Sequence, residues 1–413
     1  MSNRRTFLQQ LAGGAAWIAV SGIAVSRRVR GANDRIRIGL IGAGSRGKEI
    51  LRAARRCPNV EAVAVADVYA RRLDEAQAIA PEIKTHRDFR RLLDDKSIDA
   101  VLIATPQHQH ALNFVPAIQA GKDVYQEKTM AFNPDHARRM RKAFAGSGRV
   151  VQIGMQMNSG PGLRKVQELI NPDRMGQITA IQAHHYRNAP YGGWLRPVPS
   201  DCDADHVDWP AFEGEAPHHP FDPQRYMNWR FYWDYSGGNV FENMVHQVGF
   251  WFQVLGLGIP QTVTMAGANY HSPKMEVPDT MMVSMNQPER ILFTWNSMFA
   301  NAYYGETHDY LFGTKGTVRH DESDQVAYWP AGKKADGGGD EASRADEKAR
   351  EKTGYLDSTG RHIQNFFDCV RSRQEPVCPF EMGFRSAIAC QMAIASYRRQ
   401  RTVRWDPQTE DIV

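Results

Sequence analysis

The chain is poor in cysteine and has no cysteine or histidine spacing that is typical of a metal site. Its 413 residues hold five cysteines and no C-x-x-C motif. An odd and sparse set of cysteines argues against a disulfide framework as the basis of the fold. We expect Cys57 and Cys390 to be packing residues. A Cys369–Cys378 bridge is the alternative that an oxidising compartment would allow.

Most of the chain also lacks a net charge. The sequence holds 51 basic and 46 acidic residues, a formal charge of +5. Five of the arginines lie in residues 1–33, which contain no acid, so the rest of the chain holds 46 residues of each sign. No basic tract of the kind that binds nucleic acid occurs after residue 33, and we expect no nucleic-acid partner.

Long hydrophobic runs are absent as well. The apolar stretch at residues 11–25 is too short and too weakly apolar for a membrane span. It follows Arg4-Arg5-Thr6-Phe7-Leu8, an order typical of a twin-arginine export leader. We predict that residues 1–33 are this leader and that the twin-arginine machinery exports the protein, to the periplasm for example. Ala24-Val25-Ser26 is a candidate cleavage site, and a retained amphipathic anchor that tethers the uncleaved protein to a membrane is the alternative.

Glycine is present where a dinucleotide-binding turn needs it. The apolar pattern of residues 36–41 predicts a buried strand, and Gly42-Ala43-Gly44-Ser45-Arg46-Gly47 follows at once as Gly-x-Gly-x-x-Gly. Gly42 allows the tight turn, Gly44 lets the backbone approach a pyrophosphate, and Gly47 lets the next helix pack closely. A helix that begins near Ser45 would present its free N–H groups to the phosphates. The pattern therefore predicts a dinucleotide site.

A second strand, at residues 60–66, ends in Asp67. This residue lies 20 positions beyond Gly47, where an acid that binds a ribose hydroxyl is expected. Asp67 would repel a 2′-phosphate and so favours NAD, while Arg71 and Arg72 leave NADP open as an alternative. A solvated carboxylate at a strand end is the structural alternative for Asp67.

Residues 34–155 alternate strand and helix patterns, which predicts a parallel, doubly wound Rossmann domain. Further strands are expected at 99–105, 122–127 and 149–153. Ligands of such sheets bind beyond the carboxyl ends of the strands. This rule predicts that the following residues surround the reactive end of the cofactor: Thr105, Pro106, Gln107, His108, His110, Glu127 and Lys128.

The pattern changes at residue 156, and we predict an α+β second domain over 156–413. Strands follow one another without intervening helices, so its large open sheet should be mostly antiparallel. A polar, low-complexity segment, 331–353, predicts a mobile loop. Strands are expected at 177–186, 261–269, 280–286, 290–297, 308–313 and 317–319, with helices at 161–170, 240–255, 361–372 and 381–399.

The helix predicted over 240–255 is apolar nearly all round but carries one polar stripe. Its members Glu242, His246, Gly249 and Gln253 fall within about 60° of one another on an α-helix. A hydrogen bond between His246 and Glu242 would orient the imidazole and raise its basicity, as in many general acid/base pairs. A core histidine with an acid partner is the structural alternative.

Lys128 is the second candidate for proton transfer. It follows a predicted buried strand, beside Glu127, at the edge where a lysine with a lowered pKa could relay a proton. An ion pair between Lys128 and Glu127 is the alternative. Lys128 and His246 would both be catalytic only if they face one carbinol carbon.

A metal cluster is a further alternative for the polar stripe. Glu242 and His246, with His184 or His185 on a strand, could supply a His/carboxylate set. The same spacing fits acid/base pairing equally well, and we predict no metal.

Several motifs together resemble those of the Gfo/Idh/MocA family (glucose–fructose oxidoreductase / inositol dehydrogenase), over essentially everything after the leader. In that family a Glu-Lys-Pro lysine and an Asp-x-x-x-His pair surround the oxidised carbinol, which implies catalytic roles for Lys128, Glu242 and His246. The motifs are the glycine turn, Ala104-Thr105-Pro106 with His110, Ala120-Gly121-Lys122, Glu127-Lys128-Thr129, Tyr186-Arg187-Asn188, residues 229–238 and Glu242-x-x-x-His246.

The chain departs from the family pattern at three positions, so we expect a retuned site. Thr129 replaces the usual proline, Glu242 replaces the usual aspartate, and Gly249 stands where many members carry an acid. The predicted cofactor-binding residues are Gly42, Gly44, Ser45, Arg46, Gly47, Asp67, Thr105, Pro106, His110, Glu127 and Lys128.

The aromatic, proline-rich stretch 187–235 resembles the exported, sugar- and glycoside-acting branch of the family. Its aromatic rings suit stacking on pyranose faces and its polar side chains suit hydrogen bonds to hydroxyls, with packing as the alternative for any single ring. The predicted substrate-binding residues are Arg187, Asn188, Arg230, Trp233, Asp234 and Tyr235.

The leading prediction is an exported enzyme with a tightly held NAD that moves hydride to or from a carbinol of a sugar or glycoside. His246, oriented by Glu242, would take the hydroxyl proton, and Lys128 would stabilise charge on that oxygen. The alternatives are a redox-neutral NAD-dependent glycosidase that acts through transient oxidation at C3, and a non-catalytic sugar- or dinucleotide-binding homologue. The resemblance also implies a homo-oligomer that assembles through the sheet of the second domain.

Overall fold

The computed structural model describes residues 35–301, 308–321, 324–332 and 355–413. The predicted leader and nearly all of the predicted polar loop lie outside these residues. Within the described ranges, none of the helices combines the length and the apolar composition that crossing a membrane requires. All five cysteines are buried free thiols, so the Cys369–Cys378 bridge does not form.

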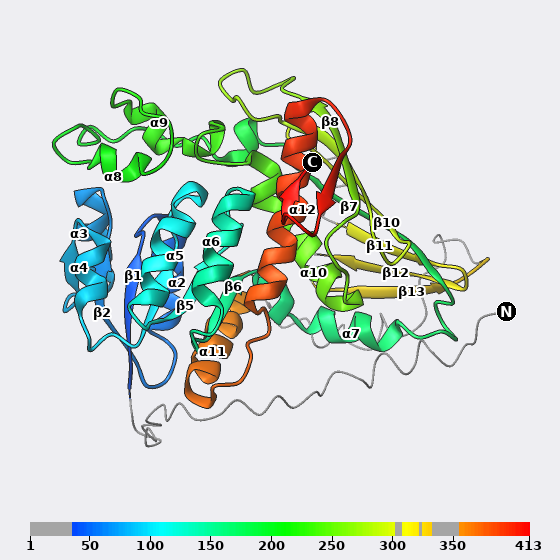
Figure 1. Cartoon of the computed structure of the whole chain (residues 1–413), viewed down its shortest axis with the longest axis horizontal. Coiled ribbons are helices and arrows are strands. Elements are labelled where there is room, and N and C mark those ends of the chain that lie inside the picture. Colours follow the sequence, from blue (N-terminus) through cyan, green and yellow to red (C-terminus); the bar gives the residue numbers. More distant parts are fainter. Residues whose placement is uncertain (1–34, 302–307, 322–323, 333–354) are drawn as a thin grey trace. The chain divides into compact units, whose positions relative to one another are not determined.

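The first half of the described chain forms a six-stranded sheet in which every pair of neighbours is parallel (Figure 1). The strand order β3-β2-β1-β4-β5-β6 reverses its direction between β1 and β4, the point at which such sheets bind ligands. The predicted Rossmann fold is confirmed. The strands are β1 (Ile36–Ile41), β2 (Val60–Ala66), β3 (Lys84–His86), β4 (Ala100–Ile103), β5 (Asp123–Glu127) and β6 (Val151–Gly154).

Helices cover both faces of this sheet, and one of them comes from the far end of the chain. Helix α11 (Tyr355–Ser372) packs on α2, and its Phe366 and Phe367 are fully buried in one hydrophobic cluster with Leu40 of β1. The order of elements along the sequence did not reveal this return. The other helices of the domain are α2 (Ser45–Ala54), α3 (Ala70–Ile79), α4 (Phe89–Asp94), α5 (His110–Gln119) and α6 (Pro134–Phe144).

The second half forms a nine-stranded sheet with the order β13-β12-β11-β7-β10-β9-β8-β14-β15. Among the described strands of this second sheet only β7 and β10 pair in parallel, so the predicted mostly antiparallel sheet is confirmed. The strands are β7 (Ile178–Tyr186), β8 (Thr262–Ala268), β9 (Thr280–Asn286), β10 (Leu292–Met298), β11 (His308–Gly313), β12 (Gly316–Asp321), β13 (Val326–Pro330), β14 (Val403–Asp406) and β15 (Asp411–Ile412).

One face of the second sheet packs on α12 (Phe380–Arg399), α10 (Val245–Leu255) and α7 (Pro161–Leu169). A single hydrophobic cluster contains residues of these helices, such as Val248 and Ile388, together with Ile103 and Val124 of the parallel sheet. The two sheets therefore share one core, which fixes the residues of one domain against those of the other.

The helix predicted over 240–255 is two elements. Val240–Met244 form a π-helix (η5), and α10 follows it. The Oγ1 of Thr129 donates a hydrogen bond to the carbonyl oxygen of Phe241 at 2.8 Å, and the Nζ of Lys128 donates to that of Glu242 at 3.0 Å. A regular α-helix would use these carbonyls for residues 245 and 246, so we attribute the wider turn to the two side chains.

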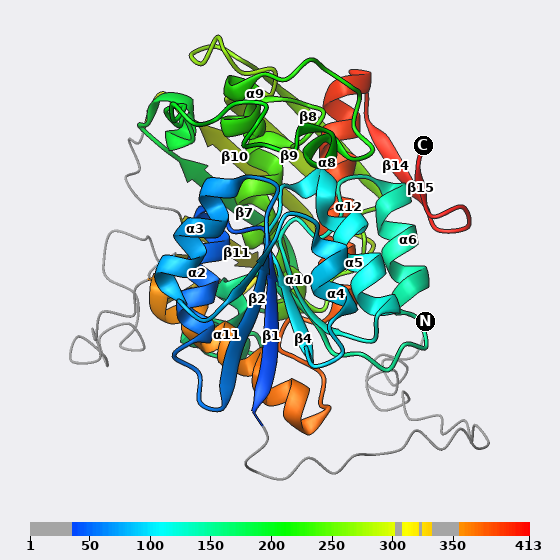
Figure 2. The same ribbon diagram turned by 90° about the vertical axis from the view of Figure 1, so that its left-hand side faces the viewer.

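Residues 194–235, called the crossing segment below, run from the second domain to the carboxyl end of the parallel sheet. Figure 2 shows the strands of that sheet ending toward α8 (Trp209–Glu213) and α9 (Pro223–Met227) of this segment. The amide of Asp208 donates to the carbonyl of Val68 at 2.9 Å, and the amide of Ala70 donates to that of His206 at 3.1 Å. The segment is thus attached just beyond the end of β2.

Candidate functional site

A cavity of about 860 Å³ lies between the carboxyl end of the parallel sheet and the second domain. Its first wall belongs to the Rossmann domain, and its second wall is formed by residues 187–242. The first wall contains nine of the predicted cofactor residues: Gly42, Gly44, Ser45, Arg46, Asp67, Thr105, Pro106, Glu127 and Lys128.

The three glycines of the turn play different parts. Gly42 has a φ of +89°, and a Cβ at Gly47 would lie 1.9 Å from the carbonyl oxygen of Gly42, so both shape the turn behind the cavity. At Gly44 nothing lies within 4 Å of the Cβ position. Gly44 also begins α2, whose first turn has no acid and no side-chain cap. Free N–H groups beside an open surface fit an anionic diphosphate.

Asp67 supports the glycine turn in addition to the ribose contact predicted for it. Its Oδ2 accepts a hydrogen bond from the amide of Ala43 at 2.7 Å, and its Oδ1 accepts one from the amide of Tyr69 at 2.9 Å. Burial raises the pKa of Asp67, and the two hydrogen bonds oppose that effect. A side chain in this position can still accept from a ribose hydroxyl, because each carboxylate oxygen has a further lone pair.

Arg71 and Arg72, which left NADP as an alternative cofactor, already have acid partners. Arg71 pairs with Asp201 at 3.0 Å, and Arg72 pairs with Glu75 at 3.3 Å. Their positions favour NAD, because a 2′-phosphate would have to compete with these carboxylates beside Asp67.

Arg46 and Glu127 form a pair within the first wall. The Nε of Arg46 lies 2.7 Å from Glu127 Oε1, and its Nη1 lies 2.8 Å from Glu49 Oε1. Glu127 is therefore the partner of Arg46. Across the described ranges the ammonium of Lys128 makes no ion pair with Glu127, which rules out the alternative that we considered for this lysine.

His110 lies behind the cavity, where it fixes two loops. Its Nδ1 is 2.7 Å from the carbonyl oxygen of Thr129 and its Nε2 is 2.9 Å from that of Thr105. Burial lowers the pKa of His110. The histidine therefore positions the chain around Thr105 and Lys128 from behind the cavity wall.

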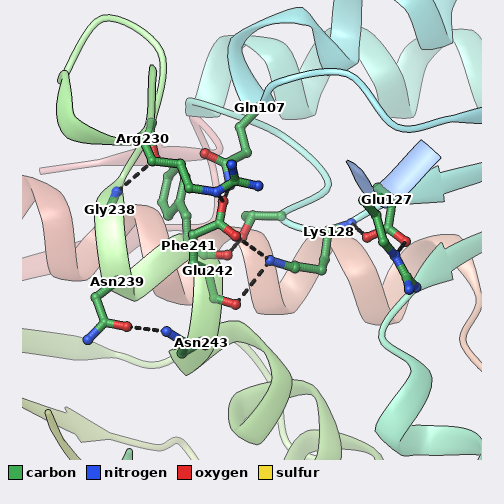
Figure 3. Close-up of polar contacts among 12 residues, drawn as sticks. Gln107, Glu127, Lys128, Arg230, Gly238, Asn239, Phe241, Glu242 and Asn243 are labelled. Atoms are coloured by element: carbon green, nitrogen blue, oxygen red, sulfur yellow. Dashed lines mark hydrogen bonds and ion pairs between the residues drawn. The ribbon is translucent and has the colours of Figure 1, made fainter. Parts of the chain in front are cut away.

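Glu242 collects polar contacts from both walls (Figure 3). Its Oε2 accepts from the Nζ of Lys128 at 2.9 Å, and its Oε1 accepts from the Nε2 of Gln107 at 2.5 Å. The Nε of Arg230 lies 3.2 Å from the same Oε1. Burial alone would raise the pKa of Glu242, but Arg230 and Lys128 outweigh it and lower that pKa to about 2. Glu242 is thus ionised at neutral pH.

The predicted hydrogen bond between His246 and Glu242 does not form. The oxygens of Glu242 are used by Lys128, Gln107 and Arg230, and the Nδ1 of His246 has no hydrogen-bond partner among the described residues. The π-helical turn accounts for the difference, because it shifts residue 242 relative to 246 from the α-helical spacing on which the prediction depended. Burial lowers the pKa of His246 well below its usual range, and Lys128 and Arg46 lower it further.

Two of the six predicted substrate residues line the cavity. Arg187 donates from Nη1 to the carbonyl of Gly192 at 3.0 Å, and the guanidinium of Arg230 lies 4.2 Å from the ring centre of Trp229. Both side chains are held in place on the second wall.

The other four predicted substrate residues lie away from the cavity lining. Tyr235 is fully buried in a hydrophobic cluster with Tyr69, and Asp234 pairs with Arg225 and with His219. Trp233 packs against Tyr397, and Asn188 bridges to Ala300 through the backbone. The crossing segment uses Tyr235 and Asp234 in its own packing and ion pairs, which composition alone does not distinguish from a sugar platform.

Sequence reasoning missed Arg196, Phe212 and Tyr226 on the second wall. They lie in an irregular segment with no periodic pattern, so no local signal marks them. Gln107 was placed near the reactive end by its position after β4, but its partner Glu242, 135 residues further along, was not predictable from spacing.

The described residues contain no group of three His, Cys, Asp or Glu side chains arranged to hold a metal ion.

Comparisons with known proteins agree with this architecture. The oxidoreductase family GFO_IDH_MocA matches residues 36–155 through its NAD-binding Rossmann fold and residues 212–404 through its C-terminal α/β domain. Inositol 2-dehydrogenase of Salmonella typhimurium is 32% identical over 37% of this chain and 46% of its own length. The 2,7-anhydro-N-acetylneuraminate hydratase of Mediterraneibacter gnavus is 25% identical over 69% of this chain and 67% of its own length.

Solved structures share the fold. Levoglucosan dehydrogenase in complex with NADH and levoglucosan superposes with a TM-score of 0.71 at 18% identity, covering 90% of this chain and 99% of that one. The WlbA dehydrogenase of Bordetella pertussis, in complex with NADH and UDP-GlcNAcA, gives 0.70 at 22% identity, covering 91% and 99%.

Proposed function

The chain belongs to the Gfo/Idh/MocA family of NAD-binding oxidoreductases, and on that premise we propose that it transfers hydride between NAD and a carbinol of a sugar or glycoside. One observation carries the proposal. The glycine turn that fits a diphosphate and the Lys128–Glu242 pair line the same cavity, so this cavity holds both N–H donors for phosphate and side chains suited to proton transfer.

The nicotinamide ring, when bound, supplies the hydride acceptor or donor. Lys128 is held by Glu242 at 2.9 Å, and its ammonium donates a hydrogen bond to the oxygen of the reacting carbinol and stabilises the charge that develops there. Glu242 positions this ammonium, and Gln107 in turn positions Glu242. His246, uncharged at neutral pH because its pKa is lowered, is the proposed acceptor of the hydroxyl proton.

The test is sugar-dependent reduction of bound NAD. Protein loaded with NAD is mixed with a panel of sugars and glycosides, and the nicotinamide absorbance is followed. Reduction by at least one sugar supports the proposal. Binding of NAD and of sugars without hydride transfer, in the wild type and in Lys128 variants alike, would favour the non-catalytic alternative.

A redox-neutral reaction is the second candidate, and the crossing segment favours it. The hydroxyl of Tyr69 donates to Asp201 at 2.9 Å, and Arg71 pairs with the same carboxylate. Further along, the Nε2 of Gln109 donates to the carbonyl of Ala211 at 3.1 Å, and Arg139 forms a two-pronged pair with Glu215. These contacts attach the segment to the Rossmann domain on several sides of the cavity, so cofactor exchange would require them to open.

In that case hydride removed at C3 of a glycoside would return to the product after the glycosidic bond is cleaved, and NAD would stay bound. A relative named as a hydratase rather than a dehydrogenase is compatible with such chemistry in this family. We expect the wild type to retain NAD through gel filtration. Asp201→Asn removes the carboxylate that holds Arg71 and should release NAD faster than the wild type does, whereas the exposed neighbour change Asp205→Asn should not. Equal release rates in all three proteins would favour the conventional dehydrogenase.

On sequence grounds alone we also propose export by the twin-arginine machinery and assembly through the second sheet. Replacing Arg4 and Arg5 with lysine should keep the protein in the cytoplasm, as cell fractionation would show.

A further inference from the structure

Two cations share one carboxylate at the end of the cavity where Lys128 and Glu242 meet. Glu242 is the partner of both Lys128, at 2.9 Å, and Arg230, at 3.2 Å. Neither cation has a second carboxylate partner within the described ranges of the chain. This group therefore holds two cations on one carboxylate, whereas Arg46 of the first wall is paired with two carboxylates, Glu49 and Glu127.

Arg196 adds a further positive charge to the second wall. It lines the cavity, and its Nη1 donates to the carbonyl oxygens of Gly193 at 2.8 Å and Leu195 at 3.2 Å. In the part of the chain that the structure describes, it forms no ion pair with an acid. Its guanidinium is thus oriented by uncharged backbone acceptors.

The position of Arg196 is built into the fold. The buried side chain of Asn228 accepts from the backbone amide of Arg196 at 2.7 Å and donates to its carbonyl at 3.3 Å. Arg187 lies on the same wall, where its Nη2 donates to Asn243 at 3.3 Å. These arginines therefore belong to an ordered wall whose backbone and side chains are fixed from behind.

Aromatic rings accompany these charges. Trp229 lies under the guanidinium of Arg230 at 4.2 Å, and Trp194 also lines the cavity. An apolar face beside a cation is the usual arrangement for holding a ring that carries a charged substituent. The diphosphate of the cofactor has its own site at the glycine turn of the first wall, so the charge of the second wall is available to another group.

Resting on the proposed function, we propose that the second wall binds the carboxylate of a sugar acid, so that the substrate is an anionic sugar such as a uronic acid or its glycoside. A guanidinium donates two parallel N–H groups to a carboxylate, which fixes the orientation of the ring as well as adding affinity. A neutral sugar would leave the positive charges beside Glu242 and at Arg196 unmatched.

The experiment compares matched pairs of ligands on the NAD-loaded, full-length protein. Glucose is paired with glucuronate, and galactose with galacturonate; calorimetry gives each Kd and the nicotinamide absorbance gives hydride transfer. We expect each acid to bind at least tenfold more tightly than its neutral partner, with the advantage shrinking as salt is raised.

Two variants test the assignment to the second wall. Arg196→Gln changes an exposed side chain and should remove most of the preference for acids while leaving the Kd of NAD, whose diphosphate site lies on the first wall, unchanged. Arg230→Gln should have the same effect on acids. Arg164→Gln, an exposed arginine of α7 away from the cavity, removes the same charge and should leave the preference intact.

Equal affinity for acids and neutral sugars, or a preference that survives both Arg196→Gln and Arg230→Gln, would overturn the inference. A stronger preference for glucose 6-phosphate than for glucuronate would overturn the assignment of a carboxylate. Failure of the proposed function would give a different result, because no ligand of either charge would then change the nicotinamide absorbance. Hydride transfer from neutral sugars as efficient as from acids would leave the function standing and refute this inference.

Discussion

The two walls of the cavity differ in how their charges are matched. On the first wall Arg46 pairs with Glu49 and Glu127, and Arg72 pairs with Glu75. On the second wall Arg230 shares Glu242 with a lysine of the first, and Arg196 donates to backbone carbonyls and meets no acid among the described residues. Beside the glycine turn the arginines are matched inside the protein, so backbone N–H groups remain for the diphosphate of the cofactor. A wall with unmatched charge selects the ligand by its charge.

The walls also differ in how far apart in the sequence their interacting residues lie. The glycines of the turn lie within six consecutive residues, whereas Glu242 reaches Lys128 and Gln107 over more than 100 positions. Changes on the first wall should therefore alter cofactor binding, and changes on the second wall should alter turnover and substrate choice.

The largest effect is expected within the glycine turn. In Gly47→Ala the new Cβ would lie 1.9 Å from the carbonyl oxygen of Gly42, so NAD binding should be lost and Tm should fall by on the order of 10 °C. Gly44→Ala meets no protein atom and its backbone has a φ of −63°, so Tm should stay within about 2 °C while the Kd for NAD rises at least about tenfold. Equal losses of Tm in the two variants would contradict the separate parts given to these glycines.

The next largest effect is expected at Lys128, whose ammonium joins the two walls through Glu242. Lys128→Met removes the ammonium held by Glu242, so turnover should fall by about 10³-fold while the Kd for NAD changes by less than about threefold. Steady-state kinetics and calorimetry measure the two quantities. Lys142→Met, on the exposed face of α6, is the control and should leave both unchanged. Turnover that survives in Lys128→Met would exclude this lysine from the chemistry.

A smaller effect follows from the ionisation of Glu242. Its pKa falls from 4.5 to about 2 on folding, so the ionised group stabilises the fold by about 3 kcal/mol above pH 4.5. This contribution is lost as the pH falls from 4.5 through 2, because the unfolded chain takes up the proton first. Urea unfolding of wild type and Glu242→Gln between pH 2.5 and 7 measures it. The difference in unfolding free energy should shrink toward the acid end, and parallel curves would refute the assigned cause.

The parallel sheet, its glycine turn and the strand-end residues could be predicted from sequence, because each signal is contained in a few adjacent positions. Thr105 and Lys128 were placed at the cavity by the rule that ligands bind beyond strand ends. The return of α11 to the first sheet has no such signal, since its apolar face would fit either domain.

The errors on the second wall have two physical causes. The pairing of Glu242 with His246 assumed an α-helix, and the side chains of Lys128 and Thr129 open that turn into a π-helix. The sugar contacts assigned to Trp233, Asp234 and Tyr235 depended on residue type alone. An irregular segment can bury the same aromatic rings in a core of its own, as the crossing segment does with Tyr235.

The most direct test of the central claim follows the hydride itself. NAD-loaded protein is incubated with neutral sugars and sugar acids that are deuterated at every ring carbon, then quenched, and the released dinucleotide is weighed by mass spectrometry. For a net dehydrogenation we predict one deuterium on the nicotinamide ring, and none in Lys128→Met. In a redox-neutral reaction the deuteride returns from the nicotinamide to the product, so only dinucleotide quenched in mid-turnover carries the deuterium. Dinucleotide that stays free of deuterium in the wild type at every quench time, with NAD and sugar both bound, would contradict hydride transfer in this cavity.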